Sequence, residues 1–269
     1  GLLQPLDIAS FYVTLGKDLR ELGRFEEAEA ALGQSLERTR QSDGTQSAQG
    51  AAALRILGIA QMLAGDFAKA SATLDEVVPL RLKNEPPTSP NVALAHVDVG
   101  NIRRLQHRYA DALRELEAAD DLFAKNTDES NPWRPQAVAG LSETQLDMGS
   151  IDSAVVTAER ALSLARKALP KGHYQLGIPL FALARAELAQ GRAADAEPLL
   201  REALMVRSPP HPADDPRVLE VNVCLVNALR ALHREDEARA LRSEIEPVLK
   251  ASASPYAAEL RARLATGSS

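Results

Sequence analysis

The chain has 269 residues, a formal net charge of −6, 45 % hydrophobic residues and only 4 % aromatic residues. The acidic balance argues against binding to nucleic acid, which needs a basic surface, and no apolar run approaches the ~18 residues of a membrane-spanning helix. The single cysteine, Cys224, excludes an internal disulfide and a cysteine-rich zinc site and fits a reducing compartment. We therefore expect a cytoplasmic protein, or a periplasmic or membrane-tethered one if the chain is part of a longer protein.

An internal repeat organises the chain from end to end. Its period is 42 residues. A period of this length indicates a structural unit that buries its apolar face only by stacking on copies of itself. Six alanines lie 42 residues apart, with no insertion or deletion between them: Ala28, Ala70, Ala112, Ala154, Ala196 and Ala238. We call a set of equivalent positions in the six aligned repeats a column. A second column, twelve residues before each alanine, holds a small residue in five of the six repeats: Gly16, Gly58, Gly100, Ser142, Ala184 and Val226.

The apolar spacing around these columns predicts two helices in each repeat. In the first repeat, Leu15, Leu19 and Leu22 share one helical face, and the spacing resumes at Phe25. Between the two helices stands a column typical of a tight turn: Gly23, Gly65, His107, Gly149, Gly191 and His233. Each repeat is therefore predicted to be a helical hairpin, and no strand is predicted.

The repeat boundaries carry separate signals for helix starts. A capping side chain followed by proline predicts a helix start at four places: Ser89-Pro90, Asn131-Pro132, Asp215-Pro216 and Ser254-Pro255. Asp66 and Ser150 are predicted to cap second helices in the same way. We predict one continuous solenoid over residues 1–269, with a capping helix at 253–266 and six repeats near 5–46, 47–88, 89–130, 131–172, 173–214 and 215–252.

These residues resemble the tetratricopeptide repeat. That family places an aliphatic-small pair on the first helix, then a turn glycine, an aromatic residue and an alanine. The first repeat matches with Leu15-Gly16, Gly23, Phe25 and Ala28. The second matches with Leu57-Gly58, Gly65, Phe67 and Ala70. The 42-residue spacing and the segment 196–204 are similar to the kinesin-light-chain-like subclass, and the composition is similar to repeat regions of bacterial serine/threonine kinases and signalling regulators.

The resemblance implies an all-α, right-handed superhelix, or α-solenoid, of six helical hairpins plus a C-terminal capping helix. It also implies a non-catalytic scaffold whose first helices line a concave groove for an extended protein or peptide segment. The polar first-helix positions that packing does not use are candidates for binding this segment: Lys17, Arg20, Arg55, Asp98, Asn101, Arg104, Gln136, Glu143, Arg185, Glu220, Asn227 and Arg230. Their Arg and Asn side chains suit an acidic or amphipathic segment.

The sequence contains no recognisable active-site motif. The sequence has no phosphate-binding glycine loop, no His-Glu-x-x-His and no nucleophile elbow, and its five histidines are dispersed over loops and repeats. We therefore expect no enzyme activity, cofactor, metal site, nucleic-acid binding or membrane insertion. An alternative is a regulatory or self-associating module of a larger bacterial signalling protein, such as a kinase or transcription regulator, that forms a homodimer or senses a small effector.

Overall fold

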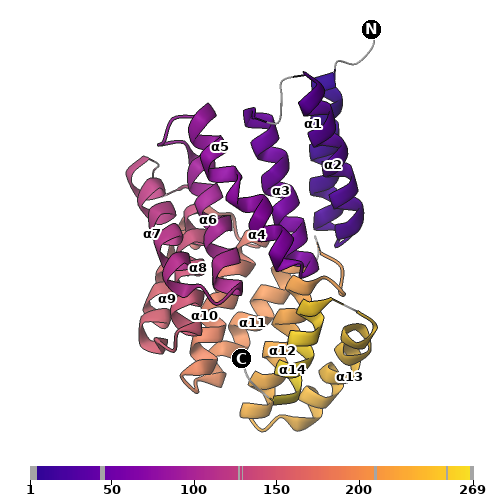
Figure 1. Ribbon diagram of the computed structural model, residues 1–269. Coiled ribbons are helices and arrows are strands. Elements are labelled where there is room, and N and C mark those ends of the chain that lie inside the picture. Colours follow the sequence, from indigo (N-terminus) through magenta and orange to yellow (C-terminus); the bar gives the residue numbers. More distant parts are fainter. Residues whose placement is uncertain are drawn as a thin grey trace. The chain divides into compact units, whose positions relative to one another are not determined.

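The computed structural model describes residues 5–42, 46–126, 128, 130–208, 211–252 and 254–266, and over these ranges it consists of helices and their connections (Figure 1). The predicted all-α fold of paired helices is confirmed. The chain divides into two compact units, which we call unit 1 (Gly1–Asn126) and unit 2 (Thr127–Ser269). A single continuous solenoid stays a prediction.

Unit 1 contains three helical hairpins. Each first helix packs on its own second helix, and the first helices of the second and third hairpins also pack on the hairpin before them. Its helices are α1 (Pro5–Glu21), α2 (Phe25–Ser42), α3 (Ala48–Ala64), α4 (Phe67–Asp75), α5 (Val77–Asn84), α6 (Pro90–Leu105) and α7 (Tyr109–Asn126).

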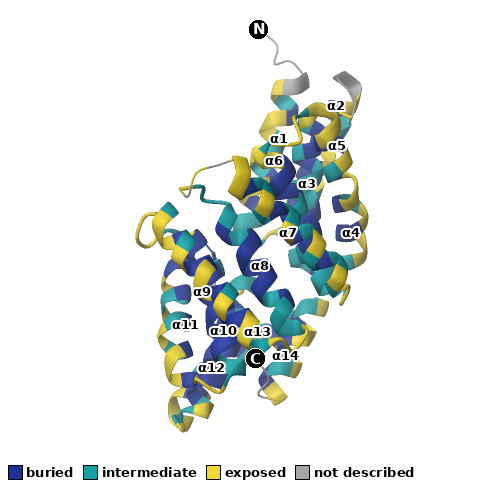
Figure 2. Ribbon diagram, turned by 90° about the vertical axis from the view of Figure 1, so that its left-hand side faces the viewer, coloured by how far each residue is buried: buried dark blue, intermediate teal, exposed yellow. Residues whose placement is uncertain are grey.

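Unit 2 contains the other three hairpins and a last helix that packs on α12 and α13. Its elements are α8 (Arg134–Asp147), α9 (Ile151–Ala168), the 3-10 turn η1 (Tyr174–Leu176), α10 (Gly177–Ala189), α11 (Ala193–Arg207), α12 (Pro216–Ala231), α13 (Glu235–Ala251) and α14 (Pro255–Thr266). Burial concentrates on the first helices, as Figure 2 shows for α8, α10 and α12, whereas the second helices keep exposed faces. No helix in the described ranges is long and apolar enough to cross a membrane.

The predicted turn column is confirmed in all six repeats. Each of its residues has a positive φ, between 58° and 89°, including His107 and His233. In the first repeat, the N–H of Gly23 donates to the carbonyl of Arg20 and that of Arg24 to the carbonyl of Leu19, at 3.1 and 2.9 Å. This pair of bonds satisfies the last carbonyls of a helix, and it recurs after α3, α6, α8, α10 and α12. A left-handed residue therefore ends every first helix.

The small column allows the two helices of a hairpin to approach closely. A Cβ built on Gly16, Gly58 or Gly100 would lie 2.5–2.6 Å from the Cγ of the facing leucine of the second helix. These leucines, Leu32, Leu74 and Leu116, follow the repeat alanines by one turn and are fully buried. The alanine column is buried as well, at no more than 2 % exposure. Ser142 instead donates through Oγ to the carbonyl of Ala154 at 2.7 Å.

The helix starts agree with the sequence in part. Ser89 accepts from the N–H of Asn91, and Asp215 accepts from the N–H of Arg217. The prediction that Ser150 caps α9 is wrong, because its side chain makes no cap hydrogen bond. The carboxamide oxygen of Asn131 accepts from the N–H groups of residues 133 and 134. Helix α8 begins at Arg134 instead of at the predicted Pro132.

The second helix of repeat two is interrupted, although the sequence predicts one continuous helix there. It breaks at Glu76 into α4 and α5. Pro79 lies three residues after the break, lacks the N–H that would donate to the carbonyl of Asp75, and its ring crowds that carbonyl. Pro247 occupies the same column in repeat six and lies inside the unbroken helix α13, so a proline at this position permits the break without requiring it.

Candidate interaction surface

In unit 1, three successive first helices contribute to one charged cluster. The guanidinium of Arg55 on α3 forms an ion pair with the carboxylate of Asp98 on α6. Burial raises the pKa of the Asp98 carboxyl, while the charges of Arg55 and of Arg20 on α1 oppose this shift. The predicted residues Arg20, Arg55 and Asp98 are therefore brought together, and we call them the Arg20–Arg55–Asp98 cluster.

The other predicted positions of unit 1 lie on the same helices. Lys17 on α1 is exposed, while Asn101 and Arg104 on α6 are half-buried. Ile59, which is also half-buried, occupies the slot of repeat two that matches Lys17 and Asn101. The first-helix surface of unit 1 thus combines basic, amide and apolar side chains.

In unit 2, the predicted residues of α8 and α10 bind one another. Arg185 on α10 donates from Nη2 to Oδ1 of Asp147 at 3.3 Å, and its Nη1 lies 3.8 Å from Oε1 of Glu143. Its Cζ lies 5.9 Å from the ring centroid of Phe181. Gln136, in the first turn of α8, is half-buried. Arg185 is thus a buried residue of an inter-repeat ion-pair group.

Two of the last three predicted positions contact α14. Glu220 on α12 pairs with Arg263 of α14 at 3.7 Å, and Arg230 donates from Nη1 to the carbonyl of Leu264 at 3.1 Å. Asn227 is buried. Burial, with Glu220 as a further cause, raises the pKa of the Tyr256 hydroxyl well above its usual value. Glu220 and Arg230 therefore hold the terminal helix in place.

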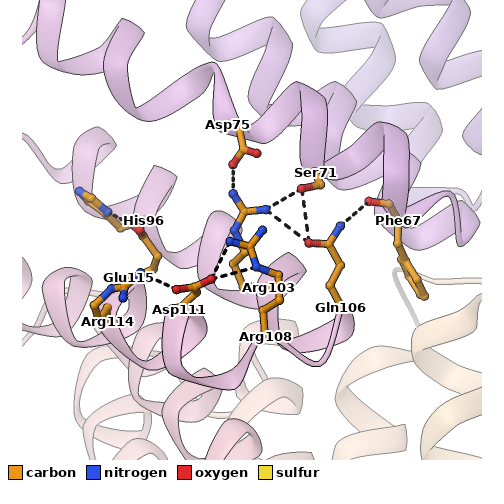
Figure 3. A network of polar contacts seen from close by, with 10 residues as sticks. All are labelled: Phe67, Ser71, Asp75, His96, Arg103, Gln106, Arg108, Asp111, Arg114 and Glu115. Carbon is orange, nitrogen blue, oxygen red and sulfur yellow. Dashed lines mark hydrogen bonds and ion pairs between the residues drawn. The ribbon is translucent and has the colours of Figure 1, made fainter.

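A second polar network in unit 1 joins repeats two and three (Figure 3). Arg103 on α6 donates from Nη1 to Oγ of Ser71 on α4 at 2.6 Å and forms an ion pair with Asp75. Gln106 donates to the carbonyl of Phe67 at 3.4 Å, and Nδ1 of His96 lies 2.6 Å from Oε2 of Glu115. Within the described ranges, no group of His, Cys, Asp and Glu side chains forms a metal site. These polar groups stabilise packing.

Sequence reasoning missed Arg207 because it lies on a second helix. Arg207 is 7 % exposed, at the end of α11. The 42-residue period contained a signal for it, because Arg207 falls in a column whose members are at most 7 % exposed: Thr39, Arg81, Phe123, Ala165, Arg207 and Leu249. A charged residue in such a column is unusual, since buried charges need compensation.

Family models of the tetratricopeptide repeat match residues 7–83 and 178–202. These two segments of the chain match tetratricopeptide repeats. A search of curated proteins gave no match. Repeat solenoids of this class present extended surfaces to protein partners, and the tetratricopeptide repeat is in general a non-catalytic protein-interaction fold.

Several solved structures share the fold. Nearly identical TPR-like repeats of a Podosopora anserina putative kinesin light chain are 20 % identical, covering 72 % of this chain and 92 % of that one, with a TM-score of 0.52. BtubC (BKLC) from P. vanneervenii is 16 % identical, covering 84 % and 91 %, with a TM-score of 0.59. A Rap protein complexed with Competence and Sporulation Factor is 12 % identical, covering 94 % and 80 %, with a TM-score of 0.66. At these identities, the likeness to tetratricopeptide repeat structures concerns the fold.

Proposed function

We propose that this protein binds an extended segment of a protein partner along the first helices of its hairpins. The observation that carries the proposal is the Arg20–Arg55–Asp98 cluster. Side chains from α1, α3 and α6 act on one another there, so the three hairpins of unit 1 contribute to one surface. An extended chain can contact several repeats of such a surface at once.

The chemistry of this surface favours an acidic or amphipathic segment. Asp98 is 6 % exposed and engaged by Arg55, so it offers little charge to a ligand. Lys17 remains exposed, and the half-buried Ile59 lies in the matching slot of the next repeat. Carboxylates of the segment bind the cationic Lys17 through charge-assisted hydrogen bonds. Apolar side chains of the segment contact Ile59.

A peptide selection tests the proposal. Twelve-residue peptides displayed on phage are selected on the full chain, and the affinities of the selected peptides are measured by fluorescence polarisation. The double variant Lys17→Glu/Asn101→Asp places negative charge on the first-helix surface. We expect this double variant to bind the selected peptides about ten-fold more weakly or worse, because it loses charge complementarity with an acidic segment.

The control makes the same two chemical changes on a second helix. Lys125 and Asn126 lie at the end of α7 and are exposed, so Lys125→Glu/Asn126→Asp adds equal charge to unit 1 away from the first helices. We expect this variant to bind the peptides as the unaltered chain does. Equal effects of the two double variants, or no selected peptide at all, would contradict the proposal. Homodimer formation, a small effector and a role in bacterial signalling stay predictions.

A further inference from the structure

Arg207 reaches from the second helix α11 between two first helices of unit 2. Its stem passes Gly177 at the start of α10 so closely that a Cβ there would lie 2.7 Å from Cγ of Arg207. Its Cζ lies 5.2 Å from the ring centroid of Phe181, and Nη1 donates to the carbonyl of Arg217 on α12 at 2.7 Å. The guanidinium is therefore held in a fixed position, and 7 % of the residue stays accessible.

This guanidinium has no ion-pair partner among the described residues. The neighbouring carboxylates are engaged elsewhere: Glu143 lies beside Arg185, and Glu220 pairs with Arg263. Burial lowers the pKa of Arg207, and the charges of Glu220 and Glu143 only partly oppose this shift. Unit 2 thus contains a buried cation whose desolvation is incompletely compensated.

The equivalent residue of repeat two shows what compensation looks like in this fold. Arg81 occupies the same column three repeats earlier and is equally buried, but it forms an ion pair with Glu85 four residues later. The residue four after Arg207 is His211. Repeat five therefore keeps the buried arginine of repeat two and lacks its carboxylate.

We propose that Arg207 binds a carboxylate of an Asp or Glu side chain in the segment that unit 2 receives. The inference rests on the proposed function, since it assigns one side chain of the bound segment. A planar guanidinium at a desolvated site matches the two oxygens of a carboxylate. Glu143 and Glu220 act on the same guanidinium, so a single negative charge fits this site better than the doubly charged phosphate of a phosphopeptide.

The test is a double-mutant cycle on the full chain with the selected peptides. Each acidic residue of a peptide is replaced singly by its amide, and Arg207→Met removes the charge while keeping an unbranched stem. We expect one Glu→Gln or Asp→Asn change to weaken binding to the unaltered chain by about ten-fold or more, and binding to the Arg207→Met variant by less than about two-fold. Peptides with phosphoserine at that position should bind more weakly than those with the acid.

Two further variants make the outcome interpretable. Arg201→Met changes the same residue type on α11, where Arg201 is half exposed and hydrogen-bonded to Glu197, so the peptide's acid should keep its full effect. Arg207→Lys keeps a charge if the methionine variant does not fold, and it should give an intermediate loss. Because the desolvation of Arg207 is incompletely compensated, Arg207→Met should leave Tm unchanged or raise it.

The outcomes separate the two proposals. If peptides bind but no acid couples to Arg207, or phosphoserine binds better, this inference is overturned while the proposed function stands. If Arg207→Met lowers Tm and leaves peptide binding unchanged, Arg207 is a structural residue and the inference is also overturned. If no peptide binds the unaltered chain, the proposed function is overturned, and so is the inference about Arg207.

Discussion

Replacing Gly100 by alanine should destabilise the protein, whereas the same change at Gly33 should stabilise it. Both glycines lie inside helices of unit 1, α6 and α2. A Cβ at Gly100 would lie 2.6 Å from Cγ of Leu116, 3.0 Å from its Cδ2 and 3.3 Å from the carbonyl oxygen of Ala112. A Cβ at Gly33 meets nothing within 4 Å. The pair therefore isolates the close approach of the two helices.

The magnitudes follow from two opposing effects. Alanine gains about 1 kcal/mol over glycine in a helix interior, and this gain is common to both variants. At Gly100 the new methyl group also overpacks against a fully buried leucine, which costs about 1–3 kcal/mol. We expect Gly33→Ala to gain about 1 kcal/mol and Gly100→Ala to lose roughly 0–2 kcal/mol, a difference of about 1–3 kcal/mol.

Urea unfolding followed by far-UV circular dichroism measures both values. Since repeat proteins can unfold in several steps, the m-values of the variants must agree before their free energies are compared. Leu116→Ala should cost about 2–5 kcal/mol alone and clearly less beside Gly100→Ala, because the new methyl group fills part of the cavity. A Gly100→Ala variant as stable as Gly33→Ala would refute the close contact.

Two other predictions concern unit 2. The hydrogen bond from Arg201, opposed by burial and aided by Arg234, lowers the pKa of Glu197 below its usual 4.5. The ionised Glu197 carboxylate therefore stabilises the fold above pH 4.5, and this contribution is lost as the pH falls through the lowered pKa. Glu197→Gln should cost about 1–2 kcal/mol of unfolding free energy at pH 7 and almost nothing in acid. Urea unfolding at several pH values measures this difference. Cys224 is fully buried, its Sγ accepts from Arg263 of α14 at 3.3 Å, and burial raises the pKa of its thiol. Deletion of residues 253–269 should speed its reaction with a disulfide reagent on the order of ten-fold or more, and an unchanged rate would show that α14 does not protect it.

The repeat period allowed the backbone to be predicted better than the surface. The turn column required a left-handed residue at one fixed offset, and His107 and His233 satisfy it as the glycines do. The small column likewise predicted where helices approach, because steric exclusion acts between neighbours within one hairpin. These features depend on local spacing, which a single sequence contains.

Side-chain partners could not be predicted in the same way. The period places Arg55 on a first helix, but its pairing with Asp98 depends on how one hairpin packs on the next. Arg230 occupies a first-helix slot of the kind assigned to a ligand, yet it binds the carbonyl of Leu264 because α14 packs on α12. Arg207 reaches the first helices from a second helix through space that a side chain at Gly177 would fill. Such contacts depend on tertiary distances.

The left-handed residue that ends every first helix restricts the lengths by which such a chain can grow or shrink. A single inserted residue within a hairpin would move the reversal point and turn the following helix's apolar face by about 100°. An insertion of a whole repeat would leave every reversal point at its proper offset. Gene duplication in steps of one hairpin would therefore preserve folding. The surface residues of the duplicated hairpin would remain free to acquire new partners.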